Sequence, residues 1–361
     1  MIVENFTDLY TDYLISSTSQ TTATGMSSLL GGVISHDRIT RHLSGEIYDS
    51  KRLWKKVKPM VEEICSSDDL VVICFDDSIE EKAYTDQSEL ICWHYDHTFN
   101  RSVKGVNFLT AMVHTKGINL PCAVEFVKKD LWVTDEKTGK SKRKSSKTKN
   151  ELFREMLRTC NQNICIDYVV NDSWFSSEEN MHLLKAILHV NFVMAIKSNR
   201  KVALSQSDKK QEKYIGIESL ELEQQTVEVW LEGLDFPLLL TKQVFKNEDD
   251  TVGELYLVTS DLNLSYQKMT SIYEKRWNIE VYHKSVKSNA SFAKSPTKTI
   301  KTQTNHFILS ILAYVKLEWL KVRNNINHFA MKSRIYLAGL IAANQELQTL
   351  LTPLNKKYII S

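Results

Sequence analysis

The sequence predicts an α/β protein with helical regions at both ends. Three observations indicate this class. Residues near both ends carry helical apolar patterns, residues 70–196 alternate apolar strands with amphipathic helices, and residues 202–259 alternate apolar and polar side chains with a period of two. At 361 residues, the chain is long enough for two or three domains with their own cores.

Residues 1–66 are expected to form a helical domain. A short amphipathic stretch is followed by two glycines, and Ser35 is placed to cap a polar helix that exposes Arg38 and Arg41. A further helix is expected from Lys51 to Ile64. Helix, glycine turn and short polar helix are typical of a helix-turn-helix, in which Arg38 and Arg41 would contact DNA. An ordinary helical hairpin accounts for the same pattern equally well.

The central region begins at Leu70. Strands are expected at residues 70–77, 105–114, 118–127, 166–170 and 191–196, and helices at 151–161 and 177–188. The second and third strands are joined by Thr115-Lys116-Gly117, which indicates a hairpin. Three strands, a helix, a strand, a helix and a strand are the element order of a ribonuclease-H-like core. We therefore predict such a catalytic core for residues 67–201 and 262–292.

The charge of the chain is unevenly distributed. The predicted core is interrupted by a mainly β insertion at residues 202–261, and the segment Gln211–Glu254 within it holds 3 Lys/Arg against 11 Asp/Glu. The segment Lys268–Ser361, which includes a helical C-terminal region at 293–361, holds 15 Lys/Arg against 4 Asp/Glu. A polyanion such as DNA would bind the second segment and be repelled by much of the first. A solvated basic helical surface is the plainer interpretation of the basic segment.

A separate basic stretch, Lys137–Lys149, holds seven Lys and Arg residues and few apolar ones. It is expected to be a loop or disordered, either following a DNA backbone or forming a solvated insertion.

Composition excludes several classes of protein. There is no run of about 18 apolar residues and no visible secretory signal, so we expect a cytoplasmic protein without a membrane partner. The six cysteines show no paired CxxC spacing, which favours reduced thiols over a zinc site.

Acidic side chains end two of the expected strands. Asp76 and Asp77 end the first, and Asp172 ends the strand that begins near Asp167. A strand-end Asp is usually a turn or cap residue. Neighbouring residues of a strand point to opposite faces, so only one of Asp76 and Asp77 can share a site with Asp172.

The most informative pattern is Tyr273, Arg276, Glu280 and Lys287. Their spacing places all four within an arc of roughly 60° on one face of one helix, and Lys284 extends the stripe. A stripe at this spacing is normally apolar. A polar, mostly basic stripe with one carboxylate indicates a metal ligand among phosphate-binding side chains.

The pattern Tyr-x2-Arg-x3-Glu-x6-Lys resembles the YREK signature of the insertion-sequence-four family of bacterial DDE transposases. The strand-end acids precede it in the family's order, and the resemblance extends from about Leu70 to Lys287. The chain departs from the family at Ser78, where the first motif usually has Thr. It also has Leu255 at the position of an insertion-strand Trp that stacks a flipped base in relatives, which leaves a DNA hairpin intermediate open.

The resemblance implies the site residues. Asp77, Asp172 and Glu280 are the expected catalytic residues, and as metal ligands they would hold two Mg²⁺ ions about 3.5–4 Å apart, with Mn²⁺ as a substitute. Side chains from the stripe and from a core strand end are expected to bind DNA phosphates, namely Tyr273, Arg276, Lys284, Lys287, Lys197 and Arg200.

The resemblance also implies the function. We expect a cut-and-paste transposase of the bacterial cytoplasm and nucleoid that binds double-stranded DNA, both terminal inverted repeats and target, as a homodimer in a synaptic complex. Two alternatives stay open: a ribonuclease-H-like nuclease without strand transfer, and a domesticated copy that binds DNA without activity.

Overall fold

The computed structural model describes residues 6–65, 69–97, 99–134, 136, 139–222, 224–246 and 250–355. The chain divides into two compact units, residues 1–48 with 284–361, and residues 49–283. The first unit therefore joins the two ends of the chain, and the second holds every strand found among the described residues. None of the helices within the described ranges is long and apolar enough to cross a membrane.

The terminal unit is helical and is built around one apolar helix. Its elements are α1 (Phe6–Ser16), α2 (Ala23–Leu29), α3 (His36–Gly45), the second half of α9 (Trp277–Asn289), α10 (Ile300–Asn324) and α11 (His328–Asn355). Phe307, Ile308 and Ile311 of α10 are almost fully buried. A helix that is apolar on most sides is a core helix, and α1 packs against it.

Polar side chains connect the two chain ends within this unit. The Asn305 amide of α10 donates to the carbonyls of Leu43 and Glu46 at the end of α3, and accepts from the backbone N–H of Tyr48. A buried amide with its partners satisfied in this way fixes where α3 ends relative to α10.

The predicted glycine turn and cap between α2 and α3 are confirmed. Gly31 and Gly32 both have positive φ, which glycine adopts without a Cβ penalty. The Ser35 side chain accepts from the backbone N–H of Arg38 and caps α3. The last helix predicted for residues 1–66 is α4 (Ser50–Ile64), and it belongs to the second unit, where it contacts β4.

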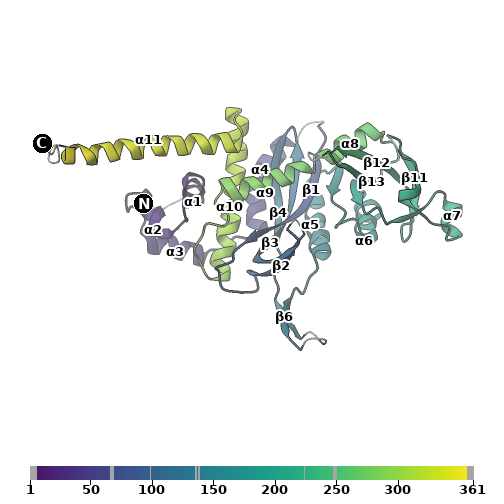
Figure 1. Ribbon diagram of the computed structural model, residues 1–361, viewed down its shortest axis with the longest axis horizontal. Helices are drawn as coiled ribbons and strands as arrows, with labels where there is room; N and C mark the ends of the chain where they lie inside the picture. The colour runs from purple at the N-terminus through teal and green to yellow at the C-terminus, as the bar shows by residue number, and fades with distance from the viewer. Residues whose placement is uncertain are drawn as a thin grey trace. The chain divides into compact units, whose positions relative to one another are not determined.

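The second unit contains a sheet of 11 strands in the order β10-β9-β11-β12-β13-β8-β7-β1-β3-β2, with β4 also paired to β3 (Figure 1). The central strands are β1 (Val72–Glu81), β2 (Cys92–Asp96), β3 (Arg101–Thr115), β4 (Ile118–Phe126), β7 (Tyr168–Asn171) and β8 (Asn191–Ile196). β1, β7 and β8 are parallel, whereas β3 runs antiparallel to β1 and β4 antiparallel to β3. The predicted β3–β4 hairpin is confirmed, and both turn residues, Lys116 and Gly117, have positive φ.

The acidic segment adds strands to the same sheet. β9 (Lys201–Ala203), β10 (Ile215–Gly216), β11 (Val227–Leu231), β12 (Leu238–Lys246) and β13 (Val252–Thr259) follow β8, and β13 pairs antiparallel with β8. Short helical segments lie between them at α7 (Gln206–Lys210) and Ile217–Ser219. The predicted β content of residues 202–261 therefore extends the central sheet.

Helices cover both faces of the central strands. On one face, Phe75 of β1 packs against Phe153 of α5 (Lys149–Asn163), with ring centroids 4.5 Å apart. On the other face, the Cys74 thiol donates to the carbonyl of Lys275, which follows α8 (Tyr266–Glu274), at 3.5 Å. Alternate residues of β1 thus face different helices.

Two predicted elements differ from the structure. The basic stretch contains strand β6 (Ser141–Lys144), whose backbone hydrogen-bonds to β5 (Leu131–Thr134). Its last residue, Lys149, begins α5. Lys137 lies outside the described residues. The helix predicted at 177–188 is α6 (Glu178–His182) followed by a π turn at Leu183–Ile187, and its cap is Ser177.

Candidate active site

The first strand delivers its two acids to opposite faces. The Asp77 carboxylate accepts from the Lys149 ammonium of α5 at 2.6 Å, and both side chains are less than one quarter exposed. Asp76 lies on the α8–α9 side with Cys74. The prediction of Asp77 as the first catalytic acid stays a prediction, and its carboxylate is engaged by α5.

The surroundings of Asp76 disfavour its charged form. Burial raises its pKa to about 8, and the negative charges of Asp172 and Asp77 add to the shift. The Arg276 guanidinium and the backbone N–H of Asp77, which donates to the Asp76 carboxylate at 2.9 Å, act in the opposite direction. A buried carboxylate beside other carboxylates favours its neutral form until a cation compensates the charge.

Asp172 follows β7 and lies beside Asp76. Cys74 of β1 pairs with Val170 of β7 in parallel register, so the same register two residues on aligns Asp76 with Asp172. The Asp172 carboxylate accepts from the backbone N–H of Trp174 at 3.0 Å, which holds it in a tight turn. Burial raises its pKa, whereas the Trp174 N–H and Arg276 lower it.

The prediction that one continuous helix carries the stripe from Tyr273 to Glu280 is wrong. α8 ends at Glu274, residues 275–276 form a turn, and α9 begins at Trp277. The Lys275 carbonyl accepts from the backbone and side chain of Asn278 and from the Cys74 thiol. The N–H of Ile279 therefore bonds to the carbonyl of Arg276 instead, and the helix is interrupted.

The turn places Arg276 beside three acids, Asp76, Asp172 and Glu280. Its guanidinium is 2.7 Å from the Glu280 carboxylate and lies 5.8 Å from the centroid of the Tyr273 ring. Its charge lowers the pKa of both Asp76 and Asp172. Its Nε is buried and has no hydrogen-bond partner among the described residues. Arg276 therefore links the acids on β1, β7 and α9 and keeps one donor unused.

Four other predicted cations belong to the terminal unit. Lys284 and Lys287 belong to the terminal unit, where the Lys284 ammonium lies 5.5 Å from the Phe329 ring centroid. Arg38 and Arg41 are exposed on α3 of the same unit.

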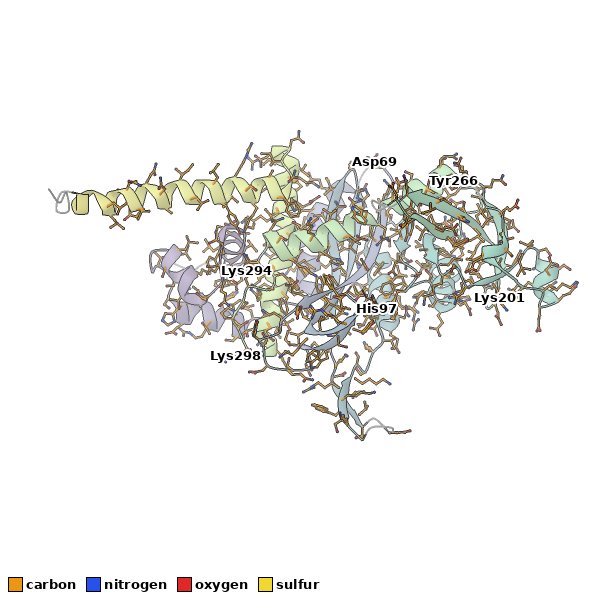
Figure 2. The ribbon with its side chains drawn as sticks, in the orientation of Figure 1. Asp69, His97, Lys201, Tyr266, Lys294 and Lys298 are labelled. Carbon is orange, nitrogen blue, oxygen red and sulfur yellow. The ribbon has the colours of Figure 1, made fainter. Side chains whose placement is uncertain are left out.

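Lys197 and Arg200 line a cavity of about 360 Å³ together with Trp174. Trp174 is 46% exposed. Its ring lies 5.5 Å from the ring of His97, the residue that follows β2 and is labelled in Figure 2. The lining also includes Ser173 and Trp174, so both cations lie beside the turn that follows Asp172.

Comparison with known families identifies this arrangement. Residues 5–216, more than half of the chain, match the family model described as DDE superfamily endonuclease. The chain belongs to the DDE superfamily of endonucleases. Residues 139–316 also match a transposase DDE domain. Neither description names the insertion-sequence-four family, so the YREK assignment stays a prediction.

Other comparisons are more distant. No curated protein sequence matches this DDE endonuclease. A solved structure with similarity is the Drosophila P element transposase strand transfer complex, at 13% identity and a TM-score of 0.28. The match covers 57% of this chain and 48% of that chain, so this endonuclease spans about half the length of the protein it matches.

These acids have the donor chemistry of a hard-cation site. Carboxylate oxygens are the ligands that Mg²⁺ prefers, and burial, with a smaller contribution from neighbouring carboxylates, raises the pKa values of Asp76 and Asp172, so that a divalent cation would stabilise their charged forms. Within the described ranges, no group of three or more His, Cys, Asp or Glu side chains is close enough to hold a metal ion. Glu280 is instead paired with Arg276, and Asp77 with Lys149.

Sequence reasoning missed two participants. Lys149 falls in the predicted basic loop, and its ammonium pairs with the Asp77 carboxylate on the α5 side of the sheet. Trp174 was only part of a strand-end motif, although it lines the cavity beside Asp172. The available signal was an aromatic residue two positions after a strand-end acid, where a turn exposes side chains.

Proposed function

We propose that this DDE endonuclease is a cut-and-paste DNA transposase, which cleaves transposon ends and joins them to target DNA with divalent metal ions. The observation that carries the proposal is the gathering of Asp76, Asp172 and Glu280 around Arg276. Acids from three separate elements that meet around a phosphate-binding guanidinium suit displacement at a phosphodiester.

The strand arrangement supports a ribonuclease-H-like core of the kind expected for this chemistry. The order β4-β3-β1-β7-β8 has one antiparallel side and one parallel side about β1. Strands β9–β13 would be the insertion between the second and third acids.

Asp76 is our candidate for the first acid, although the sequence motif favours Asp77. Asp76 shares a side of the sheet with Asp172 and Arg276, whereas Asp77 is neutralised by Lys149 on the α5 side. An acid already in an ion pair would have to release its partner before it could ligate a cation.

Asp76 and Asp172 would ligate the cations directly, and Glu280 would be the third carboxylate ligand. Bound Mg²⁺ or Mn²⁺, two per site, would supply activation of the attacking oxygen and stabilisation of the leaving oxygen. Arg276 would exchange Glu280 for a DNA phosphate, because its unused Nε suits a second, parallel hydrogen bond. Binding DNA would thus free the third carboxylate for the site.

The terminal unit would recognise DNA. Arg38 and Arg41 are exposed on a short helix that follows a glycine turn, which suits contact with terminal inverted repeats. Lys284 and Lys287 would add phosphate contacts from α9, and both would make binding sensitive to salt.

We also propose that the protein acts as a homodimer through α11. Every residue from Leu337 to Leu351 is exposed. Leu337, Leu340, Leu347 and Leu351 follow the alternating spacing of a coiled-coil seam, with Asn344 at one of its inner positions. An exposed apolar seam of this kind is stabilised when a second copy of the chain covers it and removes it from water.

The test is incubation of the protein with DNA carrying the element's ends and Mg²⁺ or Mn²⁺, followed by mapping of the products. Cuts at the ends with joined target products are expected. Cuts without joining would support a nuclease, and binding without cuts would support a domesticated DNA-binding protein.

A further inference from the structure

The cleavage chemistry makes no use of the two-stranded ribbon formed by β5 and β6. Its strands pair antiparallel, from Leu131 with Lys144 to Thr134 with Ser141, and they pack mainly on each other. Figure 1 shows β6 in an arm that extends away from β2 and β3. A two-stranded ribbon without further packing is only marginally stable in water, so it gains stability when a partner covers it.

The base of the ribbon is fixed to the rest of the second unit. The Ser146 N–H donates to the Asp130 carboxylate at 2.8 Å and closes the ribbon where its two strands leave the unit. The Lys129 ammonium donates to the carbonyl of Trp93 in β2 at 2.5 Å. These bonds connect the ribbon to the central sheet on one side.

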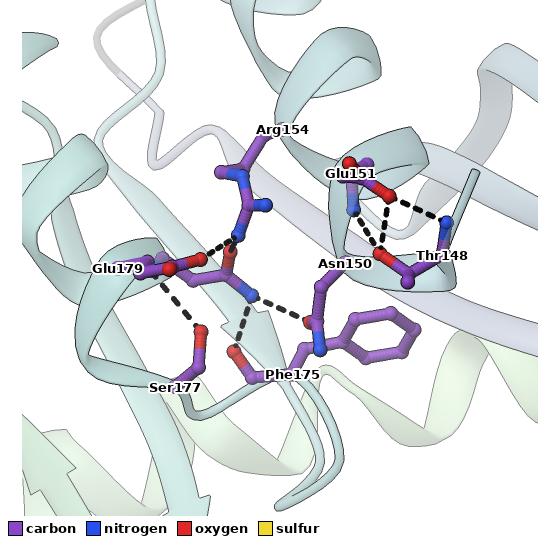
Figure 3. Close-up of polar contacts among 8 residues, drawn as sticks. Thr148, Asn150, Glu151, Arg154, Phe175, Ser177 and Glu179 are labelled. Carbon is purple, nitrogen blue, oxygen red and sulfur yellow. Dashed lines mark hydrogen bonds and ion pairs between the residues drawn. The ribbon is translucent and has the colours of Figure 1, made fainter. Parts of the chain in front are cut away.

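On the other side, the ribbon leads into the start of α5, which is also fixed (Figure 3). Thr148 and Glu151 form a capping box that satisfies the first N–H groups of the helix. Arg154 of α5 pairs with Glu179 of α6 at 2.7 Å. A ligand bound to the ribbon would therefore be held at a defined position relative to the catalytic unit.

The two faces of the ribbon carry different side chains. On one face, the Arg143 guanidinium lies 4.5 Å from the ring centroid of its cross-strand partner Trp132 and donates to the Lys129 carbonyl at 3.2 Å. On the opposite face, Lys142 and Lys144 are exposed. The first face thus stiffens the ribbon, and the second presents ammonium groups.

The charge of the ribbon favours a polyanion. Residues 128–147 hold 8 Lys and Arg against 3 Asp and Glu. Lys140 and Lys144 are exposed and form no ion pair within the described ranges. Hydrogen bonds from Ser146 lower the pKa of Asp130 and keep its carboxylate directed at the base of the ribbon. Cations without partners on a projecting ribbon suit the phosphates of a nucleic acid.

These cations suit a duplex of any sequence. An ammonium group binds phosphate as a point charge, and such contacts position a duplex without reading its bases. The guanidinium of Arg143 could read a base edge, but Trp132 and the Lys129 carbonyl already hold it. The ribbon therefore has the chemistry for binding DNA without sequence preference.

We propose that the β5–β6 ribbon enters the major groove of target DNA and holds that duplex for strand transfer. The inference rests on the proposed function. A major groove is about 12 Å wide and admits a two-stranded ribbon, and both faces of this ribbon have exposed side chains. Target DNA is the occupant because the terminal unit is proposed to recognise the repeats, whereas a ribbon that reads no bases suits the duplex into which the ends are inserted.

The first experiment measures duplex binding in chelator, so that no strand is cut. The probe is a fluorescent duplex of random sequence, titrated at several salt concentrations. Lys140→Gln combined with Lys144→Gln should lower the slope of log affinity against log salt by about 1.8, because each phosphate contact contributes about 0.9. Lys210→Gln combined with Lys213→Gln removes the same charge from exposed positions of the acidic segment and should leave the slope unchanged.

Two further measurements identify the groove and the duplex. Glucosylated 5-hydroxymethylcytosine fills the major groove, so its presence in the probe should weaken binding by the wild type more than binding by the ribbon variant. Joining of pre-cut ends to target DNA should show a KM for target raised about 10-fold in the ribbon variant, as expected for a lost charge-assisted contact. The kcat of joining and the rate of end cleavage should be kept.

Several outcomes would overturn the inference. An unchanged salt slope in the ribbon variant, or an equal change in the Lys210 and Lys213 control, would show that the ribbon holds no duplex. Equal sensitivity of wild type and ribbon variant to glucosylation would exclude entry into the major groove. Slower end cleavage with an unchanged KM for target would place the ends, and not the target, on the ribbon. A wild type that neither cuts nor joins would remove the proposed function, while a lowered salt slope would still leave the ribbon as a duplex-binding site.

Discussion

Asp76 and Asp77 are neighbours in the chain with opposite surroundings. Asp76 is buried beside Asp172 and Arg276 with its pKa raised to about 8, and Asp77 is paired with Lys149. A cation can relieve the first acid, whereas the second already has a partner. Our choice of Asp76 as the catalytic acid therefore depends on the strand face it occupies, and not on the sequence motif that favours Asp77.

Asp76→Asn should abolish metal-dependent cleavage, and Asp77→Asn should retain a measurable rate. Both variants should keep DNA affinity, because neither removes a cation. Single-turnover cleavage of pre-bound end DNA measures the rates, and Asp172→Asn is the inactive reference. A dead Asp77→Asn beside an active Asp76→Asn would restore the motif-based assignment.

Arg276→Ala should slow cleavage more than it weakens DNA binding, since the other cations still hold the duplex. A charge-assisted phosphate contact contributes roughly 1.5–3 kcal/mol, or about 10- to 150-fold in rate. Arg276→Lys should recover only part of the rate, because an ammonium cannot form two parallel bonds. Lys144→Ala on exposed β6 is the matched control, and equal rates for Arg276→Ala and Lys144→Ala would contradict a role at the scissile phosphate.

At the scale of elements, the start of α5 serves two functional regions. Thr148 caps it in a capping box with Glu151, and the next residues, Lys149 and Asn150, contact Asp77 and the cavity respectively. A cap that satisfies the first N–H groups fixes the direction of these side chains.

Thr148→Ala should lower the free energy of unfolding by about 0.5–2 kcal/mol, whereas Thr148→Ser should change it little because the hydroxyl is kept. Urea unfolding of both variants measures the difference. Equal stability of the two would mean that the cap is not stabilising.

Helix α11 is anchored on α1 by a buried ammonium. Lys332 is 5% exposed and donates to the carbonyls of Ile15 and Ser17. Burial, with a smaller contribution from Lys294, lowers the pKa of Lys332 to about 8. The hydrogen bonds orient the helix, while the buried charge opposes folding.

The stability difference between wild type and Lys332→Met should therefore depend on pH. Between about pH 8 and the unfolded value of about 10.4, the unfolded chain binds a proton that the folded chain does not. The wild type should gain stability relative to the variant as pH rises through this window and show a constant difference below it. Urea unfolding at several pH values tests this, and a difference independent of pH throughout would contradict a lowered pKa.

At the scale of the whole molecule, we expect two copies of the chain to associate through α11. Leu340→Glu and Leu347→Glu should convert the proposed dimer to a monomer, because each places charge in the apolar seam. Gln345→Glu adds the same charge off the seam and should leave the dimer intact. Sedimentation velocity measures the state, and a wild type that is monomeric at all concentrations, with and without DNA, would contradict the proposed assembly.

The sequence by itself determined the features that depend on local chemistry. A continuous apolar run indicated β1, and alternating apolar and polar residues indicated β11–β13. Two glycines and Ser35 indicated the α2–α3 turn and cap, and Lys116 with Gly117 indicated the β3–β4 hairpin. Asp172 follows β7 as the sequence indicated, whereas the prediction that Asp76 and Asp77 end the first strand is wrong, because β1 continues through both residues to Glu81 in its pairing with β3. Side-chain periodicity and turn propensity act over a few residues, so one sequence is enough to read them.

Only the tertiary structure decided which of these residues meet. The Cys74 thiol on β1 bonds to the Lys275 carbonyl, 201 positions away, at the turn that divides the expected helix and brings Arg276 among the acids. Asn305 likewise joins α10 to the end of α3. Such contacts depend on burial and on hydrogen bonds between segments remote in sequence, and no local pattern records which partner a buried polar group will find.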